Sequence, residues 1–62
     1  MKEWNFNSTH NRWNCENWYI RKEYRRVHGK IEVFYLVGND ETEYAKTFRY
    51  YHTAEAFAEK HF

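Results

Sequence analysis

Two strand-like runs lie on either side of His28-Gly29 and constrain the fold of this chain more than any other feature. The first run, WYIRKEYRRV at 18–27, alternates in polarity, and the second, KIEVFYLVG at 30–38, is rich in β-branched and aromatic residues. A two-residue loop that ends in glycine favours a type I′ turn, because both loop positions of that turn need a positive φ. The sequence therefore predicts a tight β-hairpin.

The position of this loop also sets the pairing of the two strands. Tyr24 then faces Val33, and Ile20 faces Val37. A shift by one residue would move every side chain to the opposite face, so the agreement between turn and pattern supports this register. One side of the hairpin, called the inner face below, then carries Trp18, Ile20, Tyr24, Ile31, Val33, Tyr35 and Val37.

A third strand follows the hairpin. The polar segment GNDETE at 38–43 predicts a loop, and YAKTFRYY at 44–51 predicts a strand. We expect Val37 to pair with Tyr44, which keeps the apolar side chains of the third strand on the inner face.

The last segment, HTAEAFAEKHF, predicts a helix over 53–61. Thr53 is the expected N-cap, and Glu55 lies favourably in the first turn. One helical face carries Ala54, Phe57, Ala58 and His61. We therefore expect an α+β fold, in which a three-stranded antiparallel meander over 18–51, with or without a fourth amino-terminal strand, packs its inner face against this helix.

The amino-terminal segment, residues 1–17, combines turn-forming residues with large aromatic ones. Besides five asparagines it contains Trp4, Phe6 and Trp13. Rings of this size are usually buried or in contact. The segment therefore adds a strand, forms a lid over the sheet face that carries Phe34 and Leu36, or grips a partner.

The composition limits the class of protein. Sixty-two residues make one domain with little surface to bury, so we interpret its fourteen Phe, Trp and Tyr residues as the source of its core. Cys15 is the only cysteine, which excludes an internal disulfide. A net charge of +1 gives no electrostatic reason for nonspecific binding to nucleic acid or membranes. The chain has no apolar run of about 18 residues and no signal-like start, so we expect a cytoplasmic protein that does not enter a membrane.

No group of residues has the spacing of a catalytic or metal site. Zinc needs four ligands, usually from closely spaced Cys and His pairs, whereas Cys15 and the four histidines are scattered. A nucleophile pair of Cys15 and His10 would need a third, orienting group and a pocket. We therefore expect no enzyme activity, no metal and no cofactor.

The side of the sheet opposite the helix, called the outer face below, is the candidate binding surface. Phe34 and Leu36 lie at its centre on the middle strand, and arginines surround them. An apolar centre with a polar rim is typical of a contact surface. The residues expected to bind a partner are Tyr19, Arg21, Arg25, Phe34, Leu36 and Arg49, together with Trp13 from the amino-terminal segment.

The end of the chain, FRYYHTAEAFAE, resembles the last strand and helix of the arm-binding domains of phage integrases and of plant ethylene-response-factor domains. The resemblance covers roughly residues 17–60, and the similar residues are Phe48 or Tyr51, Thr53, Glu55 and Ala56. In those families the sheet face opposite the helix contacts the DNA major groove. The resemblance therefore implies DNA contacts from Tyr19, Arg21, Arg25 and Arg49.

Three functions fit these features. The first is a non-enzymatic protein-binding module, and in size and aromatic content the chain looks like small phage and mobile-element proteins that inhibit a host protein by docking on it. The second is DNA binding through the outer face, and the third is self-association through that face. Because Glu23 and Glu32 share the face with its arginines, we expect a host or partner protein, bound by a monomer or homodimer.

Overall fold

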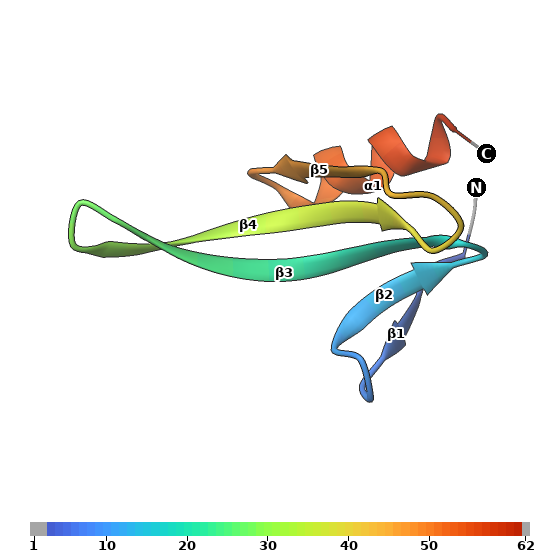
Figure 1. Cartoon of the computed structure of the whole chain (residues 1–62), viewed down its shortest axis with the longest axis horizontal. Coiled ribbons are helices and arrows are strands. Elements are labelled where there is room, and N and C mark those ends of the chain that lie inside the picture. Colours follow the sequence, from blue (N-terminus) through green and yellow to red (C-terminus); the bar gives the residue numbers. More distant parts are fainter. Residues whose placement is uncertain (1–2, 62) are drawn as a thin grey trace.

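The computed structural model describes residues 3–61 as a five-stranded antiparallel sheet with one helix on one face (Figure 1). The strands lie in chain order, so each strand pairs with its neighbours in the sequence. The α+β class is confirmed, but the sheet has more strands than the three or four expected. The elements are β1 (Asn5–Asn7), β2 (Arg12–Cys15), β3 (Trp18–Val27), β4 (Lys30–Asn39), β5 (Ala45–Phe48) and α1 (Tyr51–Glu59).

The amino-terminal segment forms a second hairpin, β1–β2, at the edge of the sheet beside β3. The asparagines make its turns: the Asn7 side-chain oxygen accepts hydrogen bonds from the backbone N–H groups of Thr9 and His10, at 3.0 and 3.3 Å. Asn11 has a φ of 53°, which asparagine tolerates better than most residues. The segment is therefore part of the sheet, and a lid over Phe34 was the wrong alternative.

The central hairpin has the predicted turn and register. His28 and Gly29 have φ values of 52° and 79°, as a type I′ turn requires. Tyr24 pairs with Val33 and Ile20 with Val37 along two ten-residue strands. The predicted inner and outer faces of the hairpin are confirmed.

The predicted pairing of the third strand is wrong by two residues. Val37 lies opposite Lys46 rather than Tyr44, and β5 ends at Phe48. The cause is that β4 stays in the sheet through Gly38, which had been assigned to the loop. A two-residue shift preserves the faces of a strand, so Phe48 still points to the inner face.

Helix α1 begins two residues before the predicted start. Tyr50 is its N-cap and makes no side-chain capping bond, so Thr53 lies inside the helix and the first turn holds no acidic residue. The Tyr51 ring packs against the ring of Trp13, with centroids 4.9 Å apart, and thereby holds the first turn against the sheet. The expected capping by Thr53 and the first-turn position of Glu55 are therefore wrong, because this tertiary contact sets the start of the helix.

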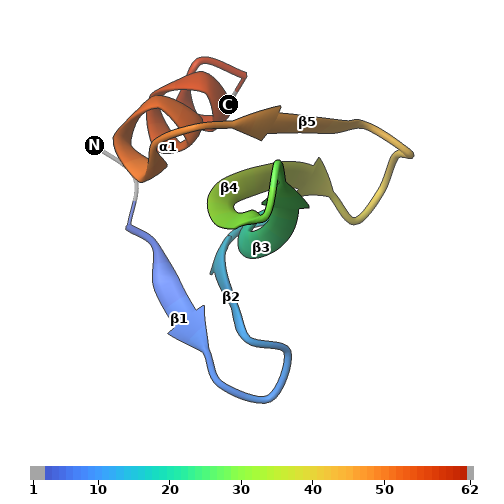
Figure 2. The ribbon, with the colours of Figure 1, turned by 90° about the vertical axis from the view of Figure 1, so that its left-hand side faces the viewer.

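The core lies between α1 and the inner face. Ile20, Val37, Ala54 and Ala58 have no exposed surface, and Phe48 completes this buried cluster. The indole N–H of Trp4 donates a hydrogen bond of 3.1 Å to Glu59 and links the two ends of the chain. Figure 2 shows the sheet curled so that β1 and α1 lie on the same side of it.

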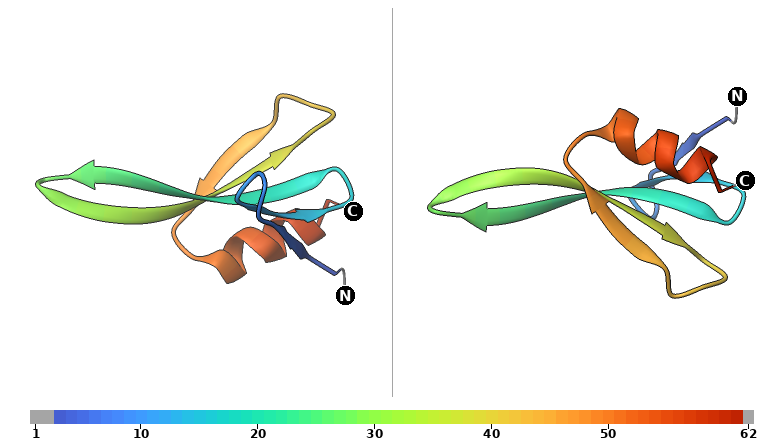
Figure 3. Two further views of the ribbon diagram at one scale, coloured as in Figure 1. Left: turned by 90° about the horizontal axis from the view of Figure 1, so that it is seen from below. Right: turned by 90° about the horizontal axis from the view of Figure 1, so that it is seen from above.

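The helix covers only part of the long hairpin. Nine helical residues span about 13 Å, whereas a ten-residue strand spans about 33 Å. The rest of β3 and β4, called the arm below and comprising residues 22–34, extends past the helix as a two-stranded ribbon (Figure 3). Within residues 3–61 no helix is both long enough and apolar enough to cross a membrane.

Candidate functional site

The outer face combines side chains from β2, β3, β4 and the chain just after β5. Alternation along each strand brings them to the side opposite α1. Phe34 and Leu36 lie near the middle, on β4, and both are half-buried. The residues of this face that carry charge or aromatic surface are Arg12, Tyr19, Arg21, Glu23, Arg25, Glu32, Phe34 and Arg49.

Two arginines lie over the ring of Phe34. The guanidinium carbon of Arg25, on β3, is 4.9 Å from the ring centroid, and that of Arg49, on the opposite side of β4, is 5.5 Å from it. Arg49 also forms a 2.9 Å ion pair with Glu32. The centre of the outer face is therefore an aromatic ring flanked by two planar guanidinium groups. Each guanidinium plane can also pack against another aromatic or apolar group.

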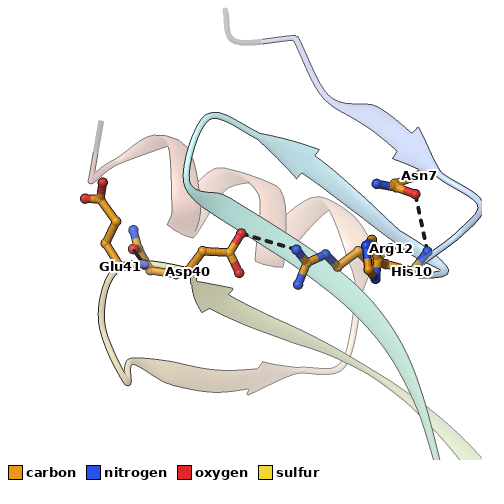
Figure 4. A network of polar contacts seen from close by, with 6 residues as sticks. Asn7, His10, Arg12, Asp40 and Glu41 are labelled. Atoms are coloured by element: carbon orange, nitrogen blue, oxygen red, sulfur yellow. Dashed lines mark hydrogen bonds and ion pairs between the residues drawn. The ribbon is translucent and has the colours of Figure 1, made fainter.

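A second stack lies toward the end of the sheet that is distant from the arm tip. Arg12 places its guanidinium carbon 4.4 Å from the centroid of the Tyr19 ring and forms a 3.2 Å ion pair with Asp40. Figure 4 shows Arg12 extending from β2 toward Asp40. The Tyr19 ring in turn covers Gly38, where a Cβ would overlap it. This glycine is what allows the tyrosine to lie flat on the sheet.

Most of the arginine charge on this face is paired. Arg21 forms a 2.6 Å ion pair with Glu23, in addition to the pairs of Arg12 and Arg49 described above. Among the described residues, Arg25 is the arginine of this face that makes no ion pair. The face therefore presents flat arginine and aromatic surfaces with only a small excess of positive charge.

The structure brings six of the seven predicted binding residues together on the outer face. Trp13 is the exception: it pairs with the buried Ile20 and lies on the inner face. Its ring packs against Phe6 and Tyr51, with centroids 5.1 and 4.9 Å away. Trp13 is therefore half-buried against the core on the inner face, apart from the other six predicted binding residues.

The sequence interpretation missed Arg12, which lies on the outer face beside Arg21. The signal was present, because Arg12 and Asn14 alternate with Trp13 and Cys15 in the manner of a strand with one buried face. It was not used because the segment is short and rich in asparagine, which favours turns.

A second group of exposed side chains lies on the inner face of the arm, past the amino-terminal end of α1. Tyr24 and Ile31 expose 66% and 67% of their surface, and Tyr50, beside the helix start, exposes 60%. The sequence interpretation placed Tyr24 and Ile31 on the inner face, and implied cover by the helix. The lengths of the elements would have shown that nine helical residues cannot cover two ten-residue strands.

The described residues contain no group of three His, Cys, Asp or Glu side chains placed to hold a metal ion. Cys15 is buried, whereas His10 is exposed in the β1–β2 turn. Burial, with the charge of Glu55 and a hydrogen bond to its carboxylate, raises the pKa of Tyr51 to about 12. A tyrosine with a raised pKa stays protonated at neutral pH and acts as a packing group and hydrogen-bond donor.

No protein-family model, no curated protein and no solved structure matches this chain.

Proposed function

We propose that this chain is a non-enzymatic module that binds a partner protein through its outer face. The observation that carries the proposal is the position of the amino-terminal hairpin. It extends the sheet edge and places no strand or helix over Phe34 and Leu36, while α1 packs on the inner face. An open sheet face with an aromatic centre then remains available for contact.

The chemistry of this face favours protein over nucleic acid. Phosphate binding needs several basic groups free to replace counterions, whereas Arg12, Arg21 and Arg49 each already have a carboxylate partner. Arginine and aromatic residues are enriched at the centres of protein interfaces, where their flat surfaces pack closely. A partner with apolar or aromatic groups would cover Phe34 and its two guanidinium neighbours.

Such a module acts by occupying a surface of its partner and needs no catalytic group. The form of this function that we propose is an inhibitor or accessory factor that docks on a host protein, as do the small phage-type proteins that the chain resembles in size and aromatic content.

The test is capture of partners with wild-type and altered outer faces. Phe34→Glu combined with Leu36→Glu should abolish capture of the partner that the wild type retains. Thr53→Glu combined with Ala56→Glu makes the same charge change at two exposed helix positions and should retain it. Equal loss in both variants, or retention in both, would contradict the proposal.

A second candidate is DNA binding, which one observation favours. Within residues 3–61, Lys22, Arg25, Arg26 and Lys30 make no ion pair, and all four lie on the arm. A basic two-stranded ribbon is narrow enough to enter a DNA major groove. Binding to mixed-sequence duplex at low salt, with a steep loss as salt rises, would support this function in place of protein binding.

A further inference from the structure

The β4 edge of the arm has no neighbouring strand. β5 pairs with β4 only over Tyr35–Gly38, and after Phe48 the chain leaves the sheet to enter α1. In the part of the chain that the structure describes, no strand pairs with β4 on this side from Ile31 to Phe34. The inner face thus ends in an open edge beside the start of the helix.

The turn geometry shows which backbone groups point to this edge. In a two-residue hairpin the residues that flank the loop, Val27 and Lys30, form the first hydrogen-bonded pair. Hydrogen-bonded and non-hydrogen-bonded pairs then alternate along the strands. The N–H and C=O groups of Ile31 and Val33 therefore point away from β3, toward the open edge. Unpaired groups of this kind are a template for another strand.

A groove of about 590 Å³ lies along the same edge. Ile31, Val33 and Tyr35 line it from β4, and Tyr50, Tyr51 and His52 line it from the start of α1. The exposed surfaces of Ile31 and Tyr50 described above belong to this groove. A strand added beside β4 would therefore place every second side chain against apolar surface.

The charges on the outer-face side of this edge favour an acidic occupant. Glu32 and Arg49, which line the groove toward the outer face, neutralise each other at 2.9 Å. Among residues 3–61, Lys30, on the outer-face side of the tip end of this edge, makes no ion pair. A second copy of this chain is the competing occupant of the edge, and the test below separates it from an acidic segment.

We infer that the open edge of β4 binds an extended, acidic segment of a partner protein by antiparallel strand addition. The apolar residues of that segment lie in the groove, and its carboxylates lie near Lys30 on the outer-face side of the edge. The apolar part of this site is separate from the outer face, because the side chains of Ile31 and Val33 point to the inner face. It therefore goes beyond the proposed docking of Phe34 and Leu36.

The test uses a short peptide with blocked ends in which valine and glutamate alternate. Its binding to the full chain is followed by backbone amide NMR, and we expect the largest shifts at Ile31, Val33 and Tyr50. The same peptide N-methylated at its valines keeps every side chain but loses the N–H groups that face β4. We expect it to bind at least about tenfold more weakly. A valine–lysine peptide should also bind more weakly, because Lys30, which lies on the same side of the edge as the charged residues of the peptide, repels it.

Two variants of the chain provide matched controls. Ile31→Pro removes an N–H group that points to the open edge and leaves the bonds to β3 in place, so it should weaken binding more than Ile31→Ala does. Leu36→Glu, at a position where β5 still pairs with β4, should retain peptide binding. Loss of partner capture by Leu36→Glu with unchanged peptide binding would separate the two sites.

Four results would overturn the inference. The first is that the N-methylated peptide binds as tightly as the valine–glutamate peptide. The second is that the valine–lysine peptide binds as tightly as the valine–glutamate peptide. The third is that the amide shifts are centred on Leu36 instead of Ile31. The fourth is a wild-type dimer that Ile31→Pro dissociates, which would assign the edge to a second copy. Should Ile31→Pro fail to fold, the N-methylated peptide with the wild-type chain still decides the question.

Discussion

The guanidinium of Arg25 lies over the ring of Phe34, with its carbon 4.9 Å from the ring centroid. Arg49 approaches the same ring from the opposite neighbouring segment, at 5.5 Å. A large apolar side chain at the centre of an open sheet face is thus partly covered by two cations that remain at the surface. This arrangement keeps Phe34 compatible with water and available to a partner.

The arrangement predicts that Phe34→Glu is tolerated by the fold. The new carboxylate would lie between two guanidinium groups, so we expect the free energy of unfolding to change by no more than about 1 kcal/mol. Phe48→Glu is the contrasting variant, because Phe48 is in the buried cluster and an unpaired charge there should prevent folding. Urea denaturation measures both. If Phe34→Glu lowered the free energy of unfolding as much as Phe48→Glu does, Phe34 would be a core residue.

The contact between Tyr19 and Gly38 predicts a steric cost. Gly38→Ala places a methyl group where the tyrosine ring lies, and we expect a loss of about 1–3 kcal/mol in the free energy of unfolding. In a Tyr19→Ala background the same change should cost much less, because the ring is gone. Chemical denaturation of the four proteins in this cycle gives the coupling. Equal costs in both backgrounds would mean that the ring does not set the requirement for glycine.

The close approach of α1 to the sheet predicts a difference between two alanines. Ala54 has no exposed surface, whereas Ala56 is exposed on the same helix. Ala54→Leu should lower the free energy of unfolding by about 1–3 kcal/mol, and Ala56→Leu should change it by less than about 0.5 kcal/mol. Thermal or urea denaturation measures both. The reverse order would place the other face of the helix against the sheet.

The pKa of Tyr51 predicts how stability depends on alkaline pH. Burial, followed by the charge of Glu55, raises this pKa from 10.0 to about 12 in the folded chain. The folded state therefore holds the phenol proton more tightly than the unfolded state, so this contribution to stability is complete below pH 10 and is lost as the pH rises to about 12. Tyr51→Phe cannot ionise and should show a smaller decline over that range. Urea denaturation across this pH range measures the decline in the free energy of unfolding for both proteins. Identical declines would contradict the assignment.

The fold was predictable where its signals are local. The His28-Gly29 turn and the alternation on either side of it together determine the register of β3 and β4. The spacing of Ala54 and Ala58 likewise identified the helix face that became buried. Each of these features depends on residues close in sequence.

The remaining features depend on contacts between distant residues. Gly38 stays in β4 because it pairs with Tyr19 on one side and with Ala45 on the other, and no local pattern reveals these pairings. The helix starts at Tyr51 because this residue packs on Trp13, which lies far away in the chain. The same packing places Trp13 on the inner face, apart from the other predicted binding residues. The outer face was predictable because strand alternation alone selects it, but Arg12 joined it only through the unforeseen β1–β2 hairpin.

The central claim, that the outer face is an exposed binding surface, is tested most directly by one paired measurement on Phe34→Glu/Leu36→Glu. The variant is examined by urea denaturation and by quantitative capture of partners, beside the wild type and the charge-matched helix variant Thr53→Glu/Ala56→Glu. We predict a cooperative unfolding transition for all three proteins and loss of the captured partner for the outer-face variant alone. An outer-face variant that does not fold, or that folds and still captures the partner, would contradict the claim.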